Sequence, residues 1–172
     1  MIKNKRGQIW VETVIYILIA LIMIGAVLAF VNPKIRQIQD KLTLDKTVEL
    51  LDELNSKITE VAAGTANKRI VNIEIKKGEL KIEPDKIIYT LDESRVAYSE
   101  PVAESDNTFV STGKLVQVRT VKKGDVYTVQ LKIEPSDVKL IYPGSALTKS
   151  SSSYKLALTN TGNNEINIEL IS

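Results

Sequence analysis

A long apolar run near the start of the chain limits what this sequence can fold into. It extends from Gln8 to Val31, and from Thr13 to Val31 nineteen consecutive residues carry no charge. At about 1.5 Å per helical residue, this stretch spans close to the ~30 Å hydrocarbon core of a bilayer. The run therefore predicts a membrane-spanning helix, with the rest of the chain attached to its C-terminal end.

An N-terminal apolar run has three ordinary uses: a cleaved secretory signal, a lipoprotein signal and a plain signal anchor. A cleaved secretory signal has a shorter core of about 7–15 residues and a small-x-small cleavage site, and residues 26–29 do not supply one. A lipoprotein signal requires cysteine, which the chain lacks. A plain signal anchor remains open: basic residues before the helix favour a cytoplasmic N-terminus, although Lys34 and Arg36 follow the helix.

A short motif at the start of the apolar run favours a different interpretation. Its residues are Lys5, Arg6, Gly7, Gln8 and Glu12. A basic-basic-glycine sequence, with an acid four residues after the first residue past the glycine, resembles the class III signal peptide of archaeal type IV pilins. The resemblance implies cleavage after Gly7, which makes Gln8 the first mature residue. The family often has serine at the third mature position, where this chain has Trp10.

The resemblance implies a structural subunit of a surface filament used for adhesion. Its expected partners are other copies of the chain, packed through their N-terminal helices, together with a prepilin peptidase, the pilus assembly platform and its ATPase, and the membrane. The precursor would be a single-pass membrane protein with its C-terminal domain outside, and the assembled form would lie at the cell surface. An archaellin is a less favoured variant, because Gln8 and Glu12 look more like a pilin.

Four residues are expected to serve assembly: Gln8, Glu12, Gly25 and Pro33. Glu12 in the first turn would offset the positive end of the helix, by a few tenths to about 1 kcal/mol. It could also pair with the amine of a neighbouring copy, because an acid within a membrane needs a partner. Gly25 would either loosen the span or permit close helix approach. Pro33 would kink the helix without ending it.

The helical pattern continues past the membrane. Residues 34–63 form the amphipathic part of a helix predicted over residues 8–66, with Gly64 as the candidate C-terminal cap. Ile35, Ile38 and Leu42 recur at spacings of three and four, and after a slip in phase the stripe resumes at Leu44. The resumed stripe comprises Leu44, Val48, Leu51, Leu54, Ile58 and Val61, and we expect it to pack against the chain's own downstream domain.

Residues 67–172 change to a two-residue period, broken by turns such as Lys123-Gly124-Asp125. Short alternating runs predict strands at 115–121, 126–133, 138–142, 154–160 and 166–171. The expected fold class is α+β: a leader over 1–7, the long helix, and an outward-facing antiparallel β-sheet or sandwich, as in a type IV pilin.

Composition argues against several functions. The chain has no His and no Cys, so the commonest catalytic base and thiolate chemistry are missing, and we expect neither an enzyme, nor a cofactor, nor a metal site. Loss of the leader would leave 20 basic and 21 acidic residues, a balance that does not favour nucleic acid. The acidic loop 99–113 matches no calcium motif. The rival function is a monomeric, signal-anchored protein with an outward-facing β-rich binding domain.

Overall fold

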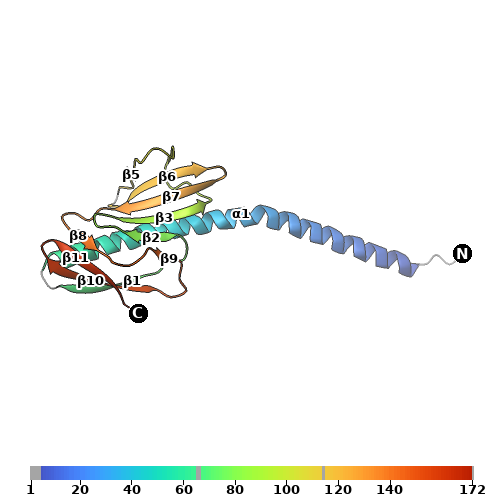
Figure 1. The fold of residues 1–172 in the computed structure, drawn as a ribbon. Helices are drawn as coiled ribbons and strands as arrows, with labels where there is room; N and C mark the ends of the chain where they lie inside the picture. Colours follow the sequence, from blue (N-terminus) through green and yellow to red (C-terminus); the bar gives the residue numbers. More distant parts are fainter. Residues whose placement is uncertain (1–4, 65–66, 114, 172) are drawn as a thin grey trace. The chain divides into compact units, whose positions relative to one another are not determined.

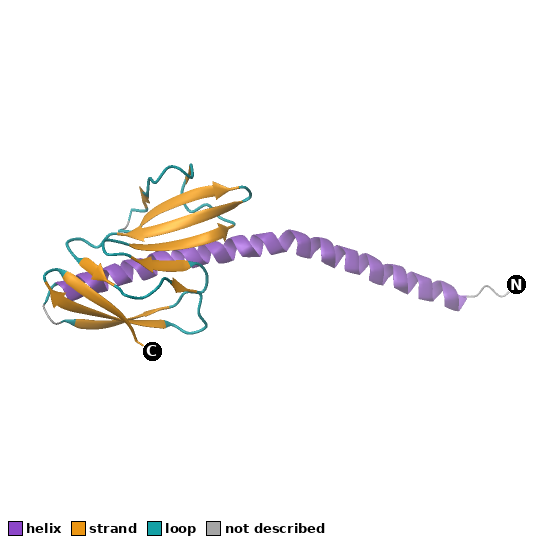
Figure 2. Cartoon of the chain, in the orientation of Figure 1, coloured by secondary structure: helices purple, strands orange, loops and turns teal. Residues whose placement is uncertain are grey.

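The structure is a computed structural model that describes residues 5–64, 67–113 and 115–171. One helix, α1 (Lys5–Ala62), is followed by short strands (Figures 1 and 2). The chain divides into two compact units, Met1–Ile38 and Gln39–Ser172. The general α+β layout, with an apolar N-terminal helix before β-sheets, is as predicted.

Eleven strands follow α1 in the described part of the chain. They are β1 (Lys68–Ile73), β2 (Glu79–Ile82), β3 (Ile87–Ser94), β4 (Pro101–Val102), β5 (Val110–Ser111), β6 (Gln117–Lys123), β7 (Val126–Ile133), β8 (Lys139–Ile141), β9 (Leu147–Thr148), β10 (Tyr154–Gly162) and β11 (Glu165–Ile171). The predicted strands at 126–133 and 166–171 correspond to β7 and β11. The two-residue strands β4, β5 and β9 are too short to show an alternating pattern.

The strands form two sheets. The smaller has the order β1-β10-β11-β8, and the larger has the order β4-β6-β7-β3-β2-β9, with β5 also paired to β6. The expectation of an antiparallel domain is wrong for two pairs: β8 runs parallel to β11, and β4 runs parallel to β6. The sheets are therefore mixed. After β7 the chain leaves the larger sheet and enters the smaller one as β8. Alternation of apolar residues predicts that a strand forms, but it does not predict which sheet the strand joins.

The second half of α1 forms the centre of the core of residues 39–172. Figure 1 shows this part of the helix between the two sheets. The side chains of the resumed stripe, Leu44 to Val61, are buried, and they pack with inward-facing residues of both sheets, such as Ile73, Leu131 and Ile168. This confirms the expectation that the stripe packs against the chain's own domain. Each such buried side chain contributes about 1.5–3 kcal/mol by leaving water.

The C-terminal end of α1 differs from the sequence-based expectation. Gly64 follows the helix but does not adopt the left-handed conformation by which a glycine usually ends one. Instead the Asn160 side chain, from β10, donates from Nδ2 to the carbonyl oxygens of Val61 at 3.1 Å, Ala62 at 3.2 Å and Gly64 at 3.1 Å. A residue ninety-eight positions away from Ala62 thus supplies a donor to the Ala62 carbonyl at the end of the helix, where carbonyls lack helical partners.

Candidate membrane and assembly segment

The first unit carries the candidate functional segment, the apolar part of α1. By length and composition α1 could cross a membrane, since its most apolar window has a mean hydropathy of 3.0 and none of that window is buried. Large apolar side chains from Trp10 to Val31 are exposed, and Trp10 and Phe30 reach 71% and 72%. The segment is therefore a candidate membrane anchor whose described apolar side chains, from Trp10 to Val31, are exposed.

The predicted processing residues lie at the start of this helix. Lys5, Arg6, Gly7 and Gln8 are all within α1, which begins at Lys5. The structure describes their backbone only, so their predicted role as a peptidase recognition sequence stays a prediction. No acidic residue lies in the first turn of α1. After the predicted cleavage the helix would begin at Gln8, and Glu12 would be its fifth residue, close to the N-terminal end.

Glu12 is exposed on the helix and has one partner within it. The Tyr16 hydroxyl, one helical turn later, donates to Glu12 Oε1 at 3.2 Å. Residues four apart lie on the same helix face, so the pair is local to this helix. The sequence analysis identified Glu12 but did not identify Tyr16 as its hydrogen-bond partner. The spacing of four residues, which places both side chains on one helix face, could have indicated the pair. The second carboxylate oxygen of Glu12 has no hydrogen bond within the described chain that the structure records.

Gly25 and Pro33 also lie within α1. A Cβ built on Gly25 would meet no atom within 4 Å, so this position is an open notch on the helix surface. Pro33 has no backbone N–H and cannot bond to the carbonyl of Ala29, one turn earlier. Neither observation tests the role in assembly that was predicted for these two residues.

The second unit has a polar cluster on the helix side of its core. Asp40, on α1, is 4% exposed and accepts from Lys77 Nζ at 2.6 Å and from the Arg95 backbone N–H at 2.8 Å. Nearby, the Tyr89 hydroxyl donates to the Lys77 carbonyl. Burial raises the pKa of Tyr89 to about 12. The cluster ties α1 to the turn that contains Lys77, which is a structural role.

The acidic loop 99–113 is held by an arginine of β6. Arg119 is buried, and its guanidinium donates to the carbonyl oxygens of Asp106 at 2.6 Å and Glu104 at 2.8 Å. The Asp106 carboxylate accepts from the Thr108 backbone N–H at 2.9 Å and from its hydroxyl, and these hydrogen bonds lower the Asp106 pKa. Among the described residues, no group of three or more acidic side chains is placed to hold a metal ion.

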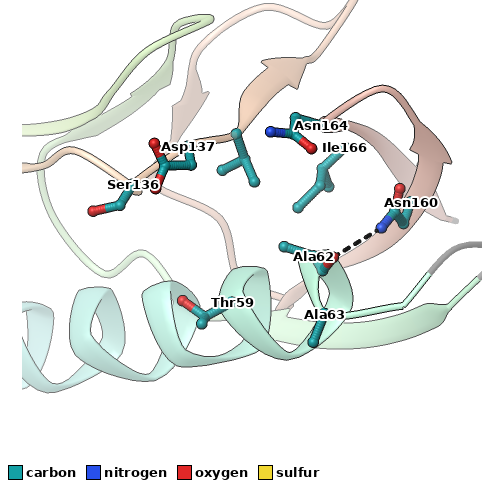
Figure 3. A pocket seen from close by; sticks show the side chains of 9 residues that line it. Thr59, Ala62, Ala63, Ser136, Asp137, Asn160, Asn164 and Ile166 are labelled. Atoms are coloured by element: carbon teal, nitrogen blue, oxygen red, sulfur yellow. Dashed lines mark hydrogen bonds between the residues drawn. The ribbon is translucent and has the colours of Figure 1, made fainter.

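One hollow of about 300 Å³ lies beside the capped end of α1 (Figure 3). Its lining comprises Thr59, Ala62, Ala63, Ser136, Asp137, Val138, Asn160, Asn164 and Ile166. Asn160 is already engaged with the helix carbonyls, as the dashed line in Figure 3 marks. The lining has no histidine or cysteine, because the chain has neither. The hollow thus offers small polar groups around a helix end and no evident nucleophile–base pair.

Comparison of the chain with protein-family models, with curated proteins and with solved structures gives no match.

Proposed function

We propose that this chain is a structural subunit of an archaeal type IV pilus-like surface filament. A prepilin peptidase would cut after Gly7, and mature copies would polymerise through their N-terminal helices. The observation that carries the proposal is the difference in burial along α1. The apolar side chains of its first part are exposed, whereas apolar side chains of its second part lie in the core of a β-domain. A filament subunit needs both parts, one to pack with other copies and one to hold its own domain.

The Lys5-Arg6-Gly7-Gln8 sequence and Glu12 support processing and assembly. Cleavage after Gly7 would create an amine at a helix end whose first N–H groups lack partners. A carboxylate of an adjacent copy could pair with that amine in an environment without water, where the pair is screened little. The oxygen of Glu12 that Tyr16 does not contact is available for such a pair.

The rival function is a monomeric anchored protein whose β-domain binds a partner outside the cell. One observation favours it: length and composition alone make α1 suitable as an ordinary anchor. The two functions differ in whether Gly7 is a processing site and whether the helix has partners of its own kind.

The substitution Gly7→Val separates them. If the chain is a prepilin, the variant should keep its leader and form no filaments, because the peptidase needs the small residue before the cut. Immunoblotting of cell envelopes for the size shift, with electron microscopy for filaments, measures both effects. Gly25→Val is the matched control for processing, since it changes another glycine of the same helix and should leave cleavage intact. Normal cleavage and filaments in Gly7→Val would contradict the proposal.

A further inference from the structure

The helix carries a basic segment directly after its apolar run. Lys34 and Arg36 are exposed and have no ion pair with another described residue. Ile35 and Ile38 lie between and after them, 44% and 60% exposed. Ile35 and Ile38 lie past the uncharged run and would be exposed to water in a lone anchored chain. A packing partner would remove this apolar surface from water.

An acidic face lies farther along α1, within residues 39–172. Glu49 and Glu53 are exposed, four residues apart on one side of the helix, and the described residues give neither of them an ion pair. Leu51 and Leu54, which are fully buried, occupy the side of this helix that packs into the core. Glu60, by contrast, is occupied by Lys57 at 2.9 Å and Arg69 at 2.8 Å. Glu49 and Glu53 thus form an acidic face available from outside.

We propose that α1 of a second copy, parallel to the first and displaced along the helix axis, places its Lys34 and Arg36 against Glu49 and Glu53. Fifteen positions separate Lys34 from Glu49 and seventeen separate Arg36 from Glu53. The displacement is therefore about 22–26 Å at 1.5 Å per residue. This inference rests on the proposed filament function and names the contact and register that neighbouring copies would use.

The same displacement accounts for the exposed apolar residues beyond the membrane-spanning run. With a shift of about 16 residues, Ile35, Ile38 and Leu42 of one copy would lie beside residues 19–26 of the other. That range belongs to the uncovered apolar run, and Leu42 is itself 52% exposed. One register thus buries apolar side chains against apolar ones and sets opposite charges side by side. An unstaggered pair would instead place Lys34 beside Lys34 and Glu49 beside Glu49, which is repulsive.

Charge reversal tests the register. The basic segment is reversed by Lys34→Glu with Arg36→Glu, and the acidic face by Glu49→Lys with Glu53→Lys. Each reversal alone should abolish filaments seen by electron microscopy, and the two reversals combined in one chain should restore them, because the complementary pairing then returns. The four side chains are exposed, and circular dichroism of the full chain in detergent checks that the fold is unchanged.

Disulfide capture tests the contact directly, on a chain that has no cysteine of its own. The pair Arg36→Cys and Glu53→Cys should give a ladder of linked multimers when filaments are oxidised. A variant with a single cysteine can form disulfides only between the same position of two copies, which gives dimers and no ladder. The double variant Arg36→Cys with Ser152→Cys is the mismatched control, because Ser152 lies in the β-domain. The expected ladder appears only for the first pair.

Three results would contradict the proposed register. Filaments could form normally with only the basic segment or only the acidic face reversed, or the combined reversal could fail to restore filaments. Oxidised filaments of the double-cysteine variant could also lack the ladder of linked multimers. Failure of the proposed function looks different. Wild-type envelopes would then contain an unprocessed chain and no filaments, and the register would be excluded along with it.

Discussion

Asn160 shows how one side chain can fix the end of a long helix. Its amide nitrogen lies within hydrogen-bond distance of three carbonyl oxygens at the end of α1, and its Oδ1 accepts from the Gly162 backbone N–H at 2.8 Å. With 8% of its surface exposed, the residue has little access to water as a replacement partner. Both ends of the amide are therefore satisfied by the fold.

Replacing this amide should weaken the second unit. Asn160→Ala removes the donor of the Ala62 carbonyl and one of the two donors of the Val61 and Gly64 carbonyls, and we expect a loss of about 1–3 kcal/mol in the free energy of unfolding. Urea titration of the full chain in detergent, followed by circular dichroism, measures it. Asn72→Ala, at an exposed asparagine of β1, should change stability by less than about 0.5 kcal/mol. Equal effects of the two substitutions would remove the capping role.

Two tyrosines make stability sensitive to alkaline pH. Burial is the main cause that raises the pKa of Tyr89 and that of Tyr98 to about 12, and Tyr98 also donates to Asp45 Oδ1 at 2.9 Å. A pKa raised in the folded state contributes stability that is complete below the ordinary value of 10 and is lost as pH rises from 10 to 12. Melting temperatures across this window should fall more steeply for the wild type than for Tyr89→Phe with Tyr98→Phe. Parallel curves would contradict this account.

At the scale of elements, the phase slip in α1 is the most informative feature. The stripe that begins at Leu44 is in phase with the core, whereas Leu42, two residues earlier, is exposed. The sequence alone predicts the buried set, because six apolar residues at helical spacing need a surface to pack on. It could not predict Asp40 as a buried member of the same face, because its partners, Lys77 and the Arg95 N–H, lie far away in the chain.

Truncations on the two sides of the slip should separate folding from assembly. Leu51→Ala removes a fully buried side chain and should cost about 2–5 kcal/mol, measured by urea titration of the full chain in detergent. Leu42→Ala is the matched control: it should leave the unfolding free energy nearly unchanged, within about 0.5 kcal/mol. A large loss of stability in Leu42→Ala would mean that this side chain belongs to the fold and is not free for a partner.

Strand prediction succeeded where apolar residues alternate and failed where distant partners decide. β7 and β11 follow from their own residues, and β10 extends only slightly beyond the predicted 154–160. The parallel pairings of β8 and β4 depend on where the chain crosses between and along the sheets. Arg119 was missed for the same reason: two of its acceptors are carbonyls of a distant loop, and the third, Gln130 Oε1 at 2.9 Å, lies on the paired strand β7.

At the scale of the whole molecule, the chain joins an apolar helical segment to a β-domain built around the continuation of the same helix. The membrane-compatible segment follows from composition and length, which a sequence states directly. The sequence of one chain does not show which molecules cover this apolar segment, because lipid or other copies of the chain would have to supply the contacts. The proposed filament therefore rests on the Gly7 motif, on Glu12 and on the uncovered side chains of α1 taken together.

The most direct test of this account is the mass of the N-terminal peptide of the protein purified from native cell envelopes. Processing as a prepilin predicts a chain that begins at Gln8, whether its amine is free, methylated or cyclised. A chain that still begins at Met1 would contradict the proposed processing, and with it the filament. The uncovered helix would then be an anchor, and the loops of the β-domain would be the place to look for a binding partner.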